Sequence, residues 1–132
     1  MTLRELSQLY WLNREITHDQ KRLKELEQLA YAPRGSKLDG MPHMSGYGDA
    51  LARSVADLAD LREAIRQKQA RCIVERRRLE AYIAGIEDSL TRDIFTYRFV
   101  DGLTWDDVAA HIGHSSEDAV KKTCYRYLRD HE

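Results

Sequence analysis

Cysteine and proline are scarce in this chain of 132 amino acids, which contains two of each. Cys72 and Cys124 are too few for a disulfide framework and both fall on expected apolar helix faces, so we expect buried free thiols. No run approaches the roughly 18 apolar residues of a membrane span, and no basic segment leads into an apolar one near the first residue. We therefore expect a cytoplasmic protein that does not bind a membrane.

The residue patterns of known catalytic and metal centres are also missing. The five histidines are scattered, with none in an H-E-x-x-H pair and none at zinc-site spacing from a cysteine. No P-loop is found, and Ser45 lacks the glycine pattern of a nucleophile elbow. The sequence therefore predicts a protein that is not an enzyme and that holds neither a metal nor a cofactor.

Charged residues are abundant, at 33% of the chain, while aromatic residues account for only 8%. This balance favours exposed, charge-rich helices over a thick globular core. The net charge is −1 at pH 7, so the chain as a whole is not the polycation that the DNA backbone attracts. Any surface that binds nucleic acid must therefore be a local one.

The first part of the chain predicts one long helix over about residues 3–31, which contain neither glycine nor proline. Its apolar residues follow the three- and four-residue spacing of a coiled-coil seam, with Asp19 in the one polar position. They are Leu9, Leu12, Ile16, Leu23, Leu26 and Ala30. Residues 32–48 then hold both prolines and four of the seven glycines, which predicts a long connecting loop.

A second helix is predicted over about residues 49–88. Its apolar side consists of Leu51, Val55, Leu58, Leu61, Ile65, Cys72, Leu79, Tyr82 and Ile86. Two such helices joined by one loop bury their apolar sides against each other or against a second copy. We therefore expect an all-α protein in which residues 1–88 form a long, coiled-coil-like antiparallel helical hairpin, and we expect a homodimer.

The last third of the chain predicts three short helices separated by two glycine-containing turns. Thr104 stands at an N-cap position three residues before Asp107, which resembles a capping box. Gly113 is expected to adopt a positive φ or an otherwise strained conformation at the second turn, and Ser115 or Ser116 is expected to cap the final helix. Residues 89–132 are therefore expected to form a helix-turn-helix domain.

The final helix, over about residues 116–129, has two contrasting faces. Val120, Cys124 and Leu128 recur every four residues and form its inner face. Basic and aromatic residues occupy the outer face, as in a helix that enters the major groove of DNA. The candidate DNA-binding residues are Ser115, Ser116, Lys121, Lys122, Tyr125, Arg126 and Arg129.

Residues 90–113, LTRDIFTYRFVDGLTWDDVAAHIG, resemble region 4 of sigma-70-type factors, where an R-Y-x-x-G-L-(S/T)-(W/Y)-x-(D/E)-(V/I)-A run opens the helix-turn-helix. The chain is more closely similar to small phage and prophage proteins identified as sigma-70-like transcriptional regulators. Residues 117–128, EDAVKKTCYRYL, resemble the end of those proteins, and residues 40–42 resemble their interhelical loop.

This resemblance implies a phage-type transcription regulator that binds double-stranded DNA in the cytoplasm of a bacterial host cell. Host RNA polymerase is a candidate partner of the helical hairpin. Arg76, Arg77 and Arg78 form the densest basic run and are candidate contacts to the DNA backbone. The alternative is a solvated helix face on which these arginines pair with Glu75 and Glu80.

Two other functions stay open on the sequence alone. Residues 101–132 contain four basic and seven acidic residues, so the acidic surface that includes Asp106, Asp107, Glu117 and Asp118 is a candidate for binding a host protein. A DNA packaging component that resembles a small terminase subunit would also combine a helix-turn-helix with a coiled-coil oligomeriser. DNA binding at low salt separates regulation from the first alternative, and subunit number separates it from the second.

Overall fold

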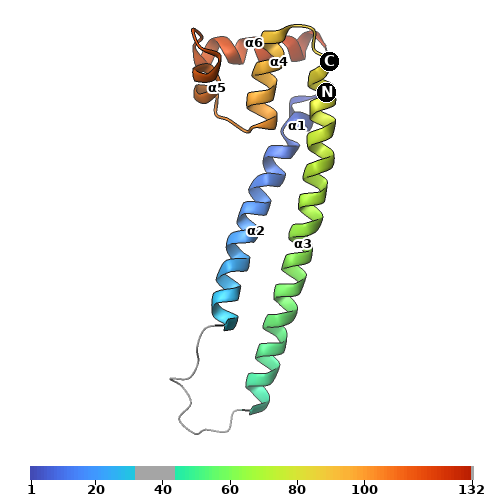
Figure 1. Ribbon diagram of the computed structural model, residues 1–132, viewed down its shortest axis with the longest axis vertical. Coiled ribbons are helices and arrows are strands. Elements are labelled where there is room, and N and C mark those ends of the chain that lie inside the picture. Colours follow the sequence, from blue (N-terminus) through green and yellow to red (C-terminus); the bar gives the residue numbers. More distant parts are fainter. Residues whose placement is uncertain (32–43, 132) are drawn as a thin grey trace. The chain divides into compact units, whose positions relative to one another are not determined.

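The computed structural model describes residues 1–31 and 44–131, and every regular element in this part of the chain is a helix (Figure 1). In chain order they are α1 (Leu3–Leu6), α2 (Gln8–Tyr31), α3 (Met44–Ala84), α4 (Ser89–Phe95), the π-helix η2 (Thr96–Val100), α5 (Trp105–Ile112) and α6 (Glu117–Asp130). The expectation of an all-α protein is therefore confirmed.

The expected long helix over residues 3–31 is interrupted at Ser7, which separates α1 from α2. The Ser7 hydroxyl donates a hydrogen bond of 2.9 Å to the carbonyl of Leu3, a side-chain contact that competes with the helical ladder and often bends a helix. A capping box between Thr2 and Glu5 starts α1. Apolar spacing alone did not reveal this interruption.

The second long helix is displaced toward the N-terminus relative to the prediction. It starts at Met44 rather than near residue 49, so Gly46 and Gly48 lie inside it and the predicted loop over 32–48 was too long. A glycine inside a helix lowers its stability by only about 1 kcal/mol relative to alanine. A helix of 41 residues such as α3 can accommodate that loss. The helix ends at Ala84 rather than at Asp88, because the Asp88 carboxylate accepts from the Thr91 amide and caps α4.

The described residues divide into two compact units, Met1–Asn13 with Arg71–Glu132, and Arg14–Ala70. The sequence-based division into residues 1–88 and 89–132 is a different partition, and it stays a prediction. We call the first of the observed units the terminal unit and the second the central unit.

The central unit consists of the later part of α2 and the earlier part of α3, which lie side by side (Figure 1). Ile16, Leu58 and Ile65 are its buried apolar residues. The Lys68 ammonium lies 2.6 Å from the Asp19 carboxylate, so the one polar position of the predicted seam is occupied by an ion pair. The hydrogen bond to Asp19 raises the pKa of Lys68.

Burial along the predicted seams is uneven. Leu9, Leu12 and Ile16 are buried as expected, whereas Leu23, Leu26 and Ala30 are only half-buried. Val55, expected on the apolar side of α3, is 50% exposed, so that assignment was wrong.

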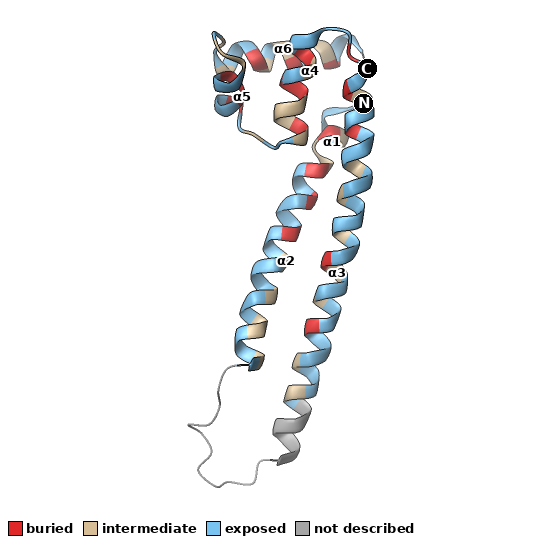
Figure 2. Ribbon diagram, in the orientation of Figure 1, coloured by how far each residue is buried: buried red, intermediate tan, exposed pale blue. Residues whose placement is uncertain are grey.

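The terminal unit contains the main hydrophobic core (Figure 2). Phe95 is fully buried at its centre, and its ring meets the rings of Phe99 and Tyr127 edge-on, with centroids 5.3 and 5.4 Å apart. The core gathers residues from every helix of the unit: Leu6, Leu9, Leu79, Ile83, Ile86, Ile94, Phe95, Phe99, Trp105, Val108, Ala109, Val120, Cys124 and Leu128. This core holds α5 and α6, which carry the candidate site.

Candidate nucleic-acid interface

The segment from α5 to α6 is shaped by its caps and its turn. The Thr104 hydroxyl accepts from the Asp107 amide at 3.2 Å and starts α5, as the sequence predicted. Ser116 is the residue that caps α6, accepting from the Ala119 amide at 3.1 Å. Gly113, between the two helices, has φ 76° and ψ 149°, so the prediction of a positive φ is confirmed.

Substituting Gly113 tests this turn. Its φ and ψ belong to a region that only glycine adopts readily, and a side chain there costs about 1–3 kcal/mol of strain. A Cβ at Gly113 would have no atom within 4 Å, so strain rather than a clash would be responsible. Gly113→Ala is expected to lower the free energy of unfolding of the terminal unit by this amount in thermal and urea denaturation.

Gly85→Ala is the matched control for that substitution. Gly85 has no positive φ, and a Cβ there would meet only the Tyr82 carbonyl, at 3.4 Å. Equal stability losses in the two variants would contradict the strained-turn interpretation of Gly113.

The inner face of α6 is packed as the sequence predicted. Val120, Cys124 and Leu128 are all buried in the core of the terminal unit. Burial raises the pKa of the Cys124 thiol to about 12, so this cysteine stays protonated and unreactive near neutral pH. Cys72 differs from the expectation of a buried thiol, since it is half-buried on α3.

The outer face of α6 carries the candidate DNA-binding residues. Four of them, Lys122, Tyr125, Arg126 and Arg129, are exposed. Lys121 is partly buried, and its ammonium lies 2.8 Å from the Glu117 carboxylate, one helical turn away. Its positive charge is therefore largely compensated within the chain.

The two serines of the predicted site have different settings. Ser116 uses its hydroxyl as the helix cap, and Ser115 is half-buried in the turn. The hydroxyl of Ser116 is therefore occupied by the helix itself, although the backbone N–H groups of the first turn remain an anion-binding feature of any helix.

An aromatic contact that the sequence did not reveal supports Tyr125. The ring of buried Trp105, at the start of α5, meets the Tyr125 ring edge-on with centroids 6.0 Å apart. The Arg98 guanidinium lies 4.6 Å from the centre of the Trp105 ring and donates a hydrogen bond of 2.9 Å to the Leu103 carbonyl. Tyr125 is therefore exposed but positioned by the core.

The first turns of α5 and α6 are acidic. The neighbouring Glu117 carboxylate raises the pKa of Asp106, and the hydrogen bond from Lys121 lowers the pKa of Glu117. Asp107 and Asp118 add two further exposed carboxylates. The positive charge of α6 is thus restricted to its middle and C-terminal turns.

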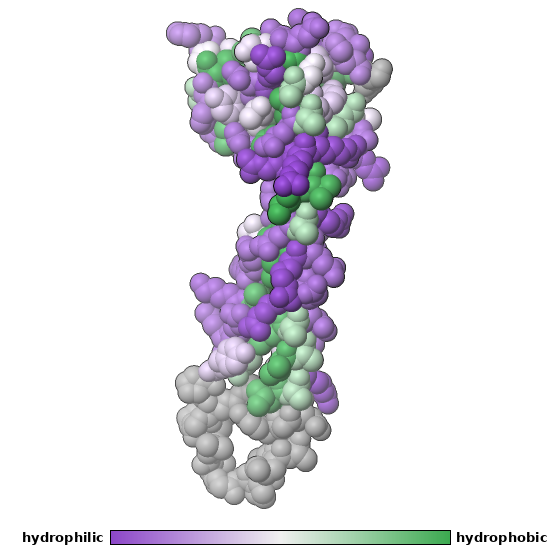
Figure 3. All heavy atoms as spheres, turned by 45° about the vertical axis from the view of Figure 1, so that its right-hand side comes forward, coloured by the Kyte–Doolittle hydropathy of each residue, from purple (hydrophilic) through white to green (hydrophobic). Residues whose placement is uncertain are grey.

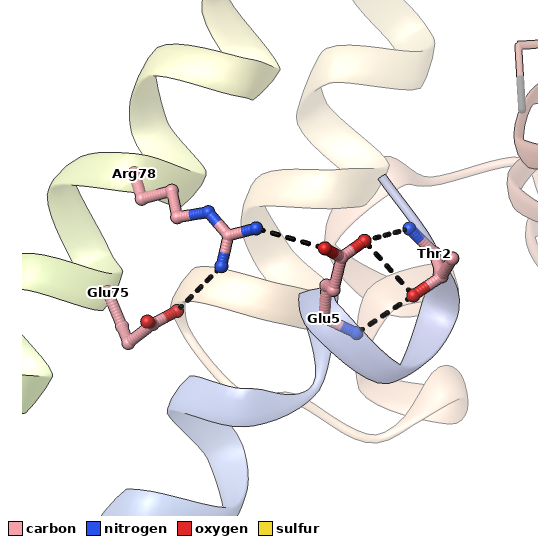
Figure 4. A network of polar contacts seen from close by, with 4 residues as sticks. All are labelled: Thr2, Glu5, Glu75 and Arg78. Atoms are coloured by element: carbon pink, nitrogen blue, oxygen red, sulfur yellow. Dashed lines mark hydrogen bonds and ion pairs between the residues drawn. The ribbon is translucent and has the colours of Figure 1, made fainter.

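The predicted backbone contacts on α3 are mostly engaged within the chain. The Arg76 guanidinium lies 3.1 Å from the Glu80 carboxylate. The Arg78 guanidinium lies between Glu5, at 3.1 Å, and Glu75, at 3.6 Å (Figure 4). Arg77 is exposed and makes no ion pair with the residues that the structure describes. The alternative of a solvated, paired face therefore describes Arg76 and Arg78.

The ion pair between Arg78 and Glu5 also connects α3 to α1 within the terminal unit (Figure 4). Glu5 accepts hydrogen bonds from the backbone and hydroxyl of Thr2, and these, with Arg78, lower the pKa of Glu5. This arrangement is a structural contact between elements. It leaves Arg78 poorly placed for a ligand.

No cluster of metal-binding side chains occurs in the part of the chain that the structure describes. Within the same residues, no helix is both long enough and apolar enough to cross a membrane. No protein-family model matches the chain, and neither the curated proteins nor the solved structures yielded a match.

Proposed function

We propose that this protein is a phage-type, DNA-binding transcription regulator in which α6 is the recognition helix of a helix-turn-helix. The observation that carries this proposal is the division of α6 into two faces. Val120, Cys124 and Leu128 fix one face in the core, while Lys122 and Arg126 project from the other into solvent. Helix-turn-helix proteins read the major groove with a helix of this kind, which packs on the domain through one face and follows a short turn.

Roles within the interface follow from chemistry and exposure. Arg126 is the proposed base-reading residue, because a guanidinium fork matches the two acceptors of guanine in the major groove. Lys122 and Arg129 lie one turn to either side of it, four and three residues away, and are proposed to bind phosphates. Tyr125 lies beside them, with a ring that fits a thymine methyl or a sugar.

Affinity is expected to be modest. Three exposed cations on one helix are few for a DNA-binding surface, and the carboxylates of Asp106 and Glu117 repel phosphate near the start of α6. A regulator of this kind needs either two linked copies or a protein partner to bind an operator tightly. In this proposal the helical hairpin formed by α2 and α3 supplies dimerisation or contacts RNA polymerase.

The test compares two triple variants with the same loss of charge. Lys122→Ala, Arg126→Ala and Arg129→Ala are combined in one chain, and Lys21→Ala, Arg22→Ala and Lys24→Ala in a control chain. All six side chains are exposed, but the control cations lie on α2. Fluorescence anisotropy with a labelled duplex from a random-sequence selection, over a series of salt concentrations, gives the affinity and its salt dependence.

The α6 variant is expected to bind weakly at every salt concentration, with a salt slope reduced by about two to three, since each lost phosphate contact removes about one. Arg126→Ala alone is expected to lose about 1–3 kcal/mol of discrimination at one base position. The control should bind like the original chain. Equal binding by both triple variants, or no binding by the original chain at low salt, would contradict the proposal.

Protein binding is the second candidate function, and the acidic first turns of α5 and α6 favour it. Asp106, Asp107, Glu117 and Asp118 are repulsive toward DNA but suit a basic segment of a host protein. A packaging component that resembles a small terminase subunit stays a further alternative, and a ring-shaped oligomer in a mass measurement would favour it over a regulator.

A further inference from the structure

The outer face of α3 within the terminal unit has an unusual composition. We define it by Ile73, Val74, Arg77, Glu80, Ala81 and Ala84, whose spacing of three and four residues places them on one side of the helix. All six are exposed, Ile73 to 56% and Val74 to 63%. Figure 3 shows that hydrophobic side chains interrupt the otherwise hydrophilic surface of the long helices.

Two features of this face lack an explanation inside the chain. Ile73 and Val74 are adjacent β-branched residues that expose apolar surface on a charge-rich helix. Arg77, which follows them by one helical turn, makes no ion pair within the described residues. Adjacent exposed apolar side chains form a small patch that another molecule can cover.

The face is complementary to itself in size. Its N-terminal end carries the larger residues, Ile73 and Val74, and its C-terminal end carries the small residues Ala81 and Ala84. When two copies of α3 run antiparallel, the large residues of each copy meet the small residues of the other. A two-fold axis repeats that contact, because residue i then meets residue j and residue j meets residue i.

The face is also complementary to itself in charge. Arg77 and Glu80 lie near its middle, so the same antiparallel pairing brings Arg77 of one copy to Glu80 of the other, twice. Glu80 otherwise pairs with Arg76 at 3.1 Å, with about half of each side chain exposed. An exposed pair of this kind contributes little to stability, so Glu80 is available for a partner.

We propose that this outer face of α3 binds the same face of a second copy and forms an antiparallel, two-fold homodimer. Ile73 and Val74 pack onto Ala81 and Ala84 of the other copy, and two reciprocal ion pairs set the register of the helices. This dimer specifies the dimerisation that the proposed function assigns to the helical hairpin. It uses α3 alone and does not depend on DNA binding by α6, so its test can fail or succeed separately from the test of DNA binding.

The first experiment measures the monomer–dimer equilibrium of the full chain by sedimentation equilibrium, without DNA. Ile73→Asp is expected to weaken the dimer by at least about tenfold, because it places a charge in an apolar contact on both sides of the axis. Val55→Asp is the matched control, because Val55 is a β-branched residue of α3 with similar exposure to Ile73, 50% against 56%, and it lies outside the proposed face. Circular dichroism is used to verify that both variants keep their helices.

The second experiment exchanges the central charges. Arg77→Glu and Glu80→Arg are each expected to weaken the dimer by about tenfold or more, because two attractive contacts become repulsive. The chain with both changes is expected to recover most of the affinity, since the opposite charges face each other again. Arg76→Ala alone should leave the dimer unchanged and controls for the loss of the Arg76–Glu80 pair.

Several results would overturn the proposal. One is that the original chain stays a monomer at all concentrations. Another is that Ile73→Asp and Val55→Asp dimerise equally well. A third is that the chain with both charge changes dimerises no more tightly than the chains with one. A dimer that depends on Ile73 but not on the charges would overturn the antiparallel register. Recovery by the double exchange, together with a selective effect of Ile73→Asp, supports it.

Discussion

Ile65→Asp is expected to unfold the central unit, with a loss on the order of 3–5 kcal/mol, because it buries an uncompensated charge. Ile65 is only 6% exposed on the side of α3 that faces α2. Three cations lie within one helical turn of it, and each is already paired. The carboxylates of Glu27, Glu63 and Asp19 lie 3.1, 2.6 and 2.6 Å from Arg62, Arg66 and Lys68, respectively. A new carboxylate at this position therefore gains no free partner.

Aspartate at two other positions provides a comparison for the stability loss of Ile65→Asp. Leu23→Asp changes a half-buried residue of α2 and should cost less, while Val55→Asp changes a half-exposed residue and should cost least. Thermal unfolding followed by circular dichroism at 222 nm gives the order. If Ile65→Asp melts at the same temperature as Val55→Asp, the two helices do not pack through this face.

The seam between α2 and α3 shows what helical spacing does and does not predict. Spacing places a residue on a face, and Leu12 and Ile16 are buried on the predicted one. Spacing does not say how much of that face a partner covers, which is why Val55 is half-exposed although it continues the pattern. Coverage depends on the shape and length of the opposite helix, and those are properties of the folded chain.

The elements of the candidate site divide in the same way. Thr104, Gly113 and Ser116 act on atoms within four residues of themselves, so the local sequence was sufficient to place the caps and the turn. The contact between Trp105 and Tyr125 crosses from one helix to the next, and no residue spacing indicates it. Long-range contacts require the packing of helices to be known first.

Charge pairing was the least predictable property. Lys121 stands on the outer face of α6 in the sequence pattern, yet Glu117 lies 2.8 Å from its ammonium. Arg78 pairs with Glu5, 73 residues away in the chain. A basic residue therefore counts toward a DNA surface only after its neighbours are known. Lys122 and Arg126 stay as cations of the proposed interface without an ion pair among the described residues, while Arg129 lies 3.6 Å from the exposed Asp130 carboxylate.

Phe95→Ala is expected to be the most destabilising change in the terminal unit, at about 3–5 kcal/mol, because it removes a large buried side chain and leaves a cavity. The Phe95 ring is fully buried and meets the rings of Phe99 and Tyr127 edge-on. Each such aromatic pair contributes about 0.5–1.5 kcal/mol beyond its buried area. Tyr127 belongs to α6, so the loss reaches the helix that carries the proposed interface.

Leu90→Ala is the control, since Leu90 lies on the same helix as Phe95 but is 46% exposed, and its change should cost little. Urea unfolding of both variants gives the free energies. A similar small loss in each would show that Phe95 does not organise the core. Because Phe95→Ala acts through folding, its DNA binding should weaken in step with the loss of folded terminal unit, whereas the triple variant of α6 should lose DNA binding while its unfolding curve stays unchanged.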